Sequence, residues 1–420
     1  MKLVSRLALA AMLSLSATAM SATPALAQKK GKDAGGAPAL QISDAFRKPA
    51  AAADAALKAG DLAALESNLA AADAVAKNDD EKYYAAYLRL QLSARKKDNA
   101  GVASALDVLL ANPKTPKESL TQYNFVRGSL YMDAKQQAQA IPYLEKARDL
   151  GSTEHDLPLL LAQAYFAGNN TAQGIAELDR AIKAEQAAGR KAPDEWYAYG
   201  LGRLYKSGDR SATADWMMRE LREYPSAANW RKLVILYRDS LNKQGQQLTK
   251  AQKIDLYRLQ NAAGALVDQN DFQDYANAAQ NSGLPWEAKK IVEQGRSSGK
   301  LPAGDSVSNQ ILTAANAAIT SDQPLAVYEK KAQADATGKT ASQTADAYLA
   351  SGEYAKAITL YQMALTKGGV DADEVNTRLG IALAMSGQKP AAKEAFAKVT
   401  GAPRADIAKM WINWIDMAAA

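Results

Sequence analysis

Small and apolar positions recur along this chain at a fixed interval between positions 122 and 182. Five residues of the first half of the stretch are matched, 34 positions later, by residues of similar size and polarity. The pairs are Gly128 and Ala162, Tyr131 and Tyr165, Ala140 and Gly174, Leu144 and Leu178, and Ala147 and Ala181. A period of this length is typical of stacked helical hairpins. The pattern therefore predicts an array of paired helices.

Tight breaks separate apolar helical stretches from position 42 onward. They contain Gly60-Asp61, Gly168-Asn169-Asn170 and Gly208-Asp209. Glycine can adopt the left-handed conformation that ends one helix, and the following Asp or Asn can cap the next. We therefore expect an all-α chain with a helical repeat array over positions 42–402, made of about ten hairpins.

The repeats are predicted with unequal clarity. The clearest are expected at 120–152, 156–183, 194–225, 341–367 and 372–400, whereas 42–112 and 240–335 fit loosely. The third clear repeat begins 40 positions after the second, so Ala181 to Pro193 should form an extended helix and loop. In that third repeat we expect Gly202 at the crossing of the two helices. The segment 403–420, with Trp411 and Trp414 at helical spacing, is expected to be a capping helix and tail.

Several of these residues resemble the tetratricopeptide-repeat (TPR) family, whose pattern is W-x2-L-G-x2-Y followed by A-x3-F-x2-A. The residues that carry the resemblance are Trp230, Leu233 and Tyr237; Ala345, Tyr348, Ala357, Tyr361 and Ala364; and Gly380, Leu383, Ala392, Phe396 and Val399. The resemblance covers about half of the chain after position 27. It implies a right-handed superhelical solenoid whose inner face is lined by the first helix of each hairpin.

Positions 1–27 have the features of a signal peptide. Lys2 and Arg6 precede the apolar run Leu7 to Leu15, and Ala25-Leu26-Ala27 offers small residues for cleavage. The alternative, a retained membrane anchor, is disfavoured because the run is short for a bilayer span. Positions 28–41 are expected to be a flexible, basic and Gly-rich leader. The protein should be periplasmic or secreted, with no membrane insertion after cleavage.

Composition narrows the possible functions. The chain has no cysteine, which excludes disulfides, thiol chemistry, cysteine-bound metal and N-terminal lipidation on cysteine. The formal charge of +6 falls to +4 once Lys2 and Arg6 are removed. A charge this small over such a length does not indicate a nucleic-acid partner, which would need clustered basic residues.

Few residues suggest catalysis, and we predict no catalytic residue, cofactor or metal. His155 is the only histidine and is expected in a polar turn. Gly338-Lys339-Thr340 ends like a phosphate-binding loop, but Gln333 stands where a glycine is required. The acidic run Asp79-Asp80-Glu81 is expected to be solvated, without the apolar pocket that a general acid needs.

One enzyme class remains as an alternative. Soluble lytic transglycosylases also use a helical superhelix, and Glu66-Ser67 and Glu118-Ser119 imitate their catalytic Glu-Ser pair. Neither pair lies within an additional lysozyme-like domain. A peptidoglycan-cleaving enzyme is therefore the less favoured interpretation.

The predicted function is a non-catalytic scaffold or adaptor that binds a protein or peptide in the groove of the solenoid. Aromatic residues give way to basic ones along the expected inner face, which consists of Phe125, Ser129, Gln163, Phe166, Tyr199, Arg203, Lys206, Arg231 and Arg238. Such a row could instead bind an anionic cell-wall or envelope polymer. It could also be ordinary core and solvated helix surface. It lacks the Lys and Asn clamp of carboxylate-binding TPR proteins.

Overall fold

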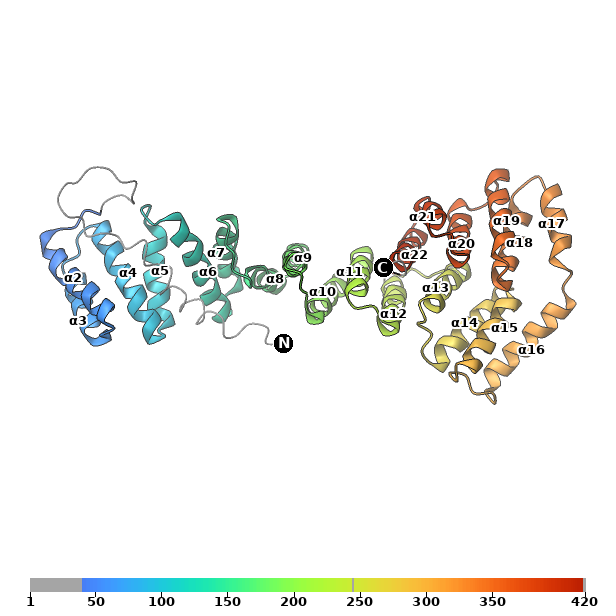
Figure 1. Ribbon diagram of the computed structural model, residues 1–420, viewed down its shortest axis with the longest axis horizontal. Helices are drawn as coiled ribbons and strands as arrows, with labels where there is room; N and C mark the ends of the chain where they lie inside the picture. The colour runs from blue at the N-terminus through green and yellow to red at the C-terminus, as the bar shows by residue number, and fades with distance from the viewer. Residues whose placement is uncertain (1–39, 244, 418–420) are drawn as a thin grey trace. The chain divides into compact units, whose positions relative to one another are not determined.

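A computed structural model describes residues 40–243 and 245–417 of the chain (Figure 1). These residues form 21 helices and no strand, which confirms the all-α prediction. They belong to two compact units, one ending at Ala192 and the other beginning at Pro193. The expected signal peptide, most of the expected leader and residues 418–420 lie outside the described residues.

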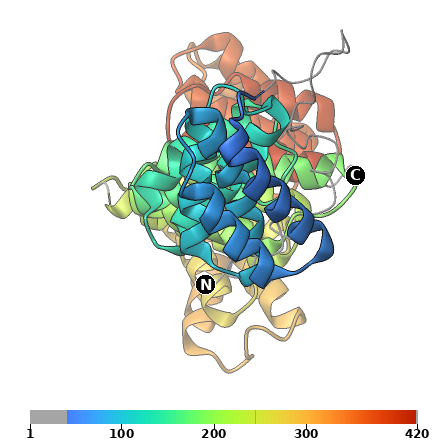
Figure 2. The same ribbon diagram turned by 90° about the vertical axis from the view of Figure 1, so that its left-hand side faces the viewer.

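Four hairpins of consecutive helices form the N-terminal unit. Neighbouring hairpins also contact one another, as α2 does with α4 and α6 with α8. The close pairing of α2 and α3 can be followed in Figure 2. The bounds are α2 Asp44–Ala59, α3 Leu62–Asp73, α4 Asp79–Lys96, α5 Asn99–Ala111, α6 Lys117–Asp133, α7 Gln137–Asp149, α8 Leu157–Ala167 and α9 Thr171–Ala187. One apolar core extends from Leu40 to Tyr165.

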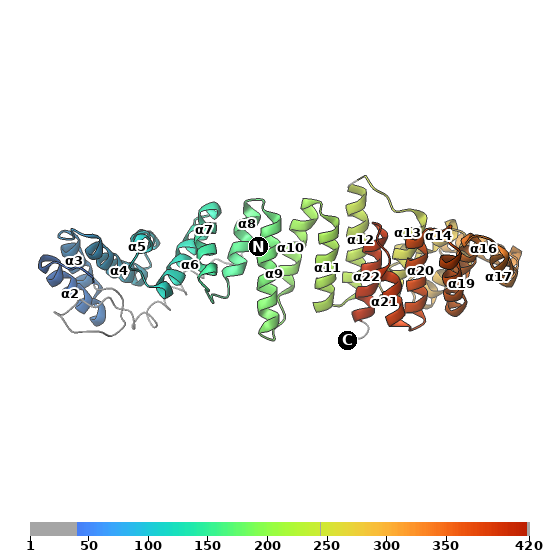
Figure 3. The same cartoon turned by 90° about the horizontal axis from the view of Figure 1, so that it is seen from above.

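Left-handed residues and capping side chains form the breaks between helices, as the sequence predicts. Gly60 adopts a left-handed φ of 77°, and Asp61 then accepts a hydrogen bond from the amide of Ala64. At the break before α9 the left-handed residue is Asn169, at φ 59°, instead of the glycine that precedes it. Helix α9 has 17 residues against 11 in α8 and extends past it in Figure 3, as the insertion in the sequence predicts.

Helix crossings in the N-terminal unit depend on small residues. A Cβ atom on Gly128 would lie 2.6 Å from Cγ of Leu144, too close for real carbon atoms. Gly202, in the C-terminal unit, does not have this role, because a Cβ atom there would meet nothing within 4 Å. The expected crossing at Gly202 is therefore wrong. Its helix instead packs through the opposite side, where Tyr197 accepts a 2.8 Å hydrogen bond at its carbonyl from Nε1 of Trp216.

We therefore expect opposite results from two alanine substitutions. Gly128→Ala should destabilise the N-terminal unit by about 1–3 kcal/mol, because the added methyl group overlaps Leu144. Gly202→Ala should stabilise the protein by about 0.5–1 kcal/mol, because alanine favours an exposed helix over glycine. Urea unfolding followed by far-UV circular dichroism measures both. Equal effects of the two substitutions would contradict the packing described.

In the C-terminal unit the last helix, α22, packs against helices from the first half of the unit. Helices α10 and α11, α14 and α15, α18 and α19, and α20 and α21 form pairs. Helix α22 contacts not only α20 and α21 but also α11 and α13 (Figure 1). The bounds are α10 Asp194–Ser207, α11 Arg210–Glu223, α12 Ala227–Lys243, α13 Lys250–Ala262, α14 Gln269–Asn281, α15 Pro285–Ser297, α16 Ser306–Ser321, α17 Leu325–Ala334, α18 Lys339–Ser351, α19 Tyr354–Lys367, α20 Ala372–Met385, α21 Lys389–Ala397 and α22 Arg404–Met417.

Side chains on two sides of α22 hold it in place. Trp411 is fully buried, and its ring stacks on that of Phe396 from α21. Asp406 accepts a 3.0 Å hydrogen bond from Tyr237 of α12 and pairs with Arg210 of α11 at 3.3 Å. The expected capping segment thus covers the last hairpin and also joins it to helices almost 200 positions earlier in the chain.

Candidate functional site

The expected groove residues of the N-terminal unit lie mostly in the core. Phe125, Ser129 and Phe166 are buried, and Gln163 is partly buried. The Ser129 hydroxyl donates to the carbonyl of Phe125 at 2.9 Å. The Phe166 ring fills the space beside Gly174, where a Cβ atom would lie 2.5 Å from it. These three side chains therefore stabilise hairpins and are not exposed.

The expected groove residues of the C-terminal unit contact their own chain. Arg203 donates to the hydroxyl of Tyr199 at 3.3 Å, and Arg238 donates to Tyr257 at the same distance. Arg231 pairs with Asp268 at 2.7 Å and with Asp271 at 2.9 Å. Lys206 is exposed. The structure does not bring these basic groups together as a continuous unpaired row.

Two carboxylates that were expected to be solvated are buried. Glu81 is fully buried, and its Oε atoms accept hydrogen bonds from the amides of Ser43 and Lys77 at 2.8 and 2.7 Å. Asp80 accepts from the amide of Gln41 at 2.7 Å. Their function is to attach the segment before α2 to the start of α4. Adjacent acids in a turn can therefore be structural when backbone donors converge on them.

Stability of the N-terminal unit should depend on the ionisation of Glu81. Burial alone would raise the pKa of Glu81, but the amides of Lys77 and Ser43 lower it from 4.5 to about 2. Because the folded pKa is the lower one, the stabilisation is present above pH 4.5 and is lost as the pH falls toward 2. Far-UV circular dichroism during urea unfolding at several pH values measures this loss. Glu81→Gln should flatten that dependence, and an unchanged slope in the variant would assign it to other groups.

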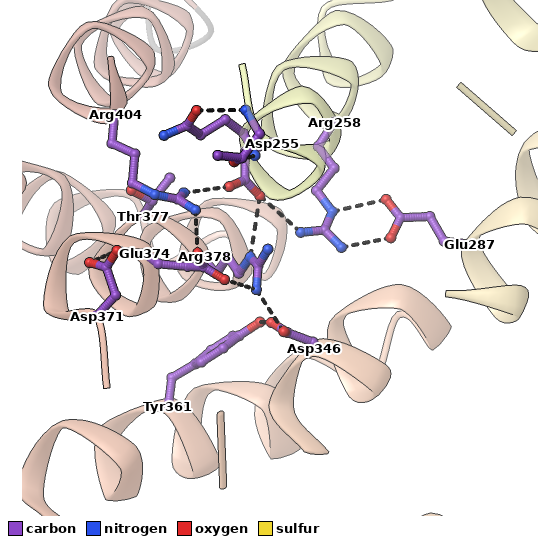
Figure 4. Close-up of polar contacts among 12 residues, drawn as sticks. Asp255, Arg258, Glu287, Asp346, Tyr361, Asp371, Glu374, Thr377, Arg378 and Arg404 are labelled. Atoms are coloured by element: carbon purple, nitrogen blue, oxygen red, sulfur yellow. Dashed lines mark hydrogen bonds and ion pairs between the residues drawn. The ribbon is translucent and has the colours of Figure 1, made fainter. Parts of the chain in front are cut away.

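The most concentrated charge among the described residues is a buried cluster in the C-terminal unit (Figure 4). We name it the Asp255 cluster. It contains three arginines and four carboxylates from five helices, namely Asp255 and Arg258 of α13, Glu287 of α15, Asp346 of α18, Glu374 and Arg378 of α20, and Arg404 of α22. It therefore connects segments up to 149 positions apart in the sequence.

Asp255 lies at the centre of this cluster and is fully buried. Its carboxylate pairs with Arg404 at 2.7 Å, Arg258 at 3.1 Å and Arg378 at 3.5 Å. Burial would raise the pKa of Asp255, but the three guanidinium groups hold it below its ordinary value. Arg258 also binds both oxygens of Glu287, at 2.9 and 2.6 Å. Every charge of the cluster is therefore paired with at least one opposite charge, with one carboxylate in excess of the three guanidinium groups.

Comparison of the sequence with models of protein families and with curated protein sequences finds no match. No helix within 40–243 or 245–417 is long and apolar enough to cross a membrane.

A small pocket lies beside the Asp255 cluster, between α13, α14, α15, α18, α19, α20 and α22. Its volume is about 60 Å³. Arg258 and Glu287 reach it from the cluster, Leu349 and Ile381 supply apolar surface, and Lys290 and Met385 also line it. We name it the Met385 pocket. No spacing in the sequence indicates this pocket, because its walls come from segments more than 100 positions apart.

Most of the groups that could suggest catalysis form ion pairs or hydrogen bonds within the chain, and the Glu-Ser acids are exposed. Burial raises the pKa of Asp346, but its two oxygens accept hydrogen bonds from Tyr361 and Arg378, each at 2.6 Å. His155 is half exposed and lies 2.9 Å from Glu185. Glu66 is exposed and pairs with Lys96 at 2.5 Å, and Glu118 is also exposed. No group of three potential metal ligands occurs within the described part of the chain.

Proposed function

We propose that this chain is a non-catalytic, TPR-like scaffold of the cell envelope that binds a protein or peptide. The proposal includes a right-handed superhelical stacking of its hairpins, and export directed by positions 1–27. Stacked hairpins suit this role because they form a preorganised surface that loses little entropy on binding. The observation that carries the proposal is the Met385 pocket, which opens beside a cluster whose charges are already paired.

The charge arrangement favours a protein or peptide over an anionic polymer. A polymer would need unpaired basic groups along a surface. Arg231 is instead paired with Asp268 and Asp271, while Arg203 and Arg238 lie against tyrosines. Arg231 would have to give up contacts with two carboxylates before it could bind a polymer.

Crosslinking in isolated cell envelopes, followed by identification of the attached molecule, tests this proposal. The purified full chain should then bind the purified partner saturably, and added salt should weaken binding only modestly. Steep loss with salt and recovery of a polymer would favour the polymer. Release of soluble fragments from purified cell wall by the protein would contradict the non-catalytic assignment.

A further inference from the structure

We propose that the Met385 pocket anchors one short apolar side chain of a partner peptide, and that Lys290 binds an acidic residue next to that anchor. This inference rests on the proposed binding function and specifies the chemistry of the partner. It places the recognition site on residues other than those that the sequence suggested.

The size of the pocket limits what it can hold. Pockets for drug-sized molecules commonly measure about 300–1,000 Å³. The Met385 pocket measures about 60 Å³, which suits part of a side chain and not a nucleotide or a sugar. A partner peptide could therefore place only one small anchoring group in the pocket.

The lining of the pocket favours an apolar anchor. Leu349 and Ile381 are buried and form part of its surface, whereas Met385 is 39% exposed. Arg258 and Glu287 are bonded to each other through two hydrogen bonds. An apolar group placed against this pair would therefore not leave an unpaired charge buried. A charged anchor would have to break the pair.

The charged residues around the pocket indicate which residue should follow or precede the apolar anchor in the partner peptide. Lys290 is exposed and forms no ion pair with the residues described, whereas the adjacent Lys289 lies 4.0 Å from Glu293. Tyr354 also lines the pocket, and the acid beside it in the sequence, Glu353, pairs with Lys356 at 2.7 Å. Glu353 therefore already has a basic partner other than Lys290. Lys290 is thus an available positive charge at a pocket whose other side is apolar, formed by Leu349 and Ile381. An acidic residue of the ligand complements it.

Selection from a phage-displayed library of random peptides on the full chain tests the proposal. Enriched peptides should share a short apolar residue next to Asp or Glu, and a synthetic peptide of that sequence should bind in solution. Lys290→Glu should weaken this binding about tenfold, because it reverses the charge that the acid contacts. Lys289→Glu is the matched control on the same helix and should leave affinity unchanged. Ala350→Leu should also weaken binding, by filling the pocket from its wall.

The results separate this inference from the proposed function. An envelope partner that binds wild type and Lys290→Glu equally would overturn the inference and leave the scaffold function standing. Enriched peptides without an acidic residue, or no enrichment at all, would also overturn it. Concentration-dependent dimerisation of the chain alone, lost in Lys290→Glu, would assign the pocket to a second copy and contradict the peptide proposal. Unchanged melting of Lys290→Glu shows that any loss of binding is not unfolding.

Discussion

Asp255→Ala should destabilise the C-terminal unit by about 3–5 kcal/mol, because it leaves buried arginines without their shared carboxylate. Arg258 would keep Glu287 and Arg404 would keep Glu374, but their positive charges would then face one another across the vacated site. We expect α22 to separate from α13 first. Their contact includes the Arg404 ion pair and the hydrogen bond from Trp411 to the carbonyl of Asp255.

Tryptophan fluorescence during urea unfolding measures this effect selectively. All six tryptophans of the sequence lie beyond position 193, so the signal reports on the C-terminal unit alone. Glu293→Ala removes an exposed carboxylate of the same unit and should change stability by less than about 1 kcal/mol. If both variants unfold at the same urea concentration, the Asp255 cluster does not hold the unit together.

Gly338→Ala should also destabilise the C-terminal unit, by about 1–3 kcal/mol. A Cβ atom on Gly338 would lie 2.2 Å from the carbonyl oxygen of Ala364 and 2.8 Å from its Cα. Because these are backbone atoms, no side-chain rotation can relieve the overlap. The start of α18 would have to move away from α19 and lose the 2.8 Å hydrogen bond between the Gly338 amide and Gly368.

Gly304→Ala is the control for this substitution. Gly304 belongs to the same unit, has no left-handed φ and would place a Cβ atom in open space. Its urea midpoint, measured by tryptophan fluorescence, should match that of the wild type. A midpoint for Gly338→Ala that also matches the wild type would show that α18 can shift without cost.

Local spacing predicted the hairpins well where side chains of fixed size recur. Gly128 must be small because it packs against Leu144 where its two helices cross. The same combination of a small residue and a leucine, Ala162 and Leu178, recurs 34 positions later in the next hairpin. The same spacing misplaced Gly202. Gly200 and Gly202 both lie in α10, and the interval alone does not say which side of a helix turns toward its neighbour.

Two features could not be predicted from the spacing of residues. They are the packing of α22 against α11 and α13, and the burial of the charged residues around Asp255. Nothing in the order of helices says that Arg404 will meet Asp255, 149 positions earlier. Charged residues are normally exposed, so an Asp at 255 or an Arg at 378 does not by itself indicate a buried position. One signal was present, because Asp255 and Arg258 are each flanked by apolar residues on both sides in Ile254-Asp255-Leu256-Tyr257-Arg258-Leu259. A charge so enclosed indicates an ion pair within the core.

Photo-crosslinking from the rim of the Met385 pocket tests the central claim, that this pocket is where a partner protein binds. A photoreactive amino acid would replace Met385 in the full chain, and Val108 of the N-terminal unit is the matched control at the same 39% exposure. We expect one adduct from position 385 in living cells that make the protein, absent from position 108 and suppressed by Lys290→Glu. An adduct from position 108 with none from position 385 would contradict it.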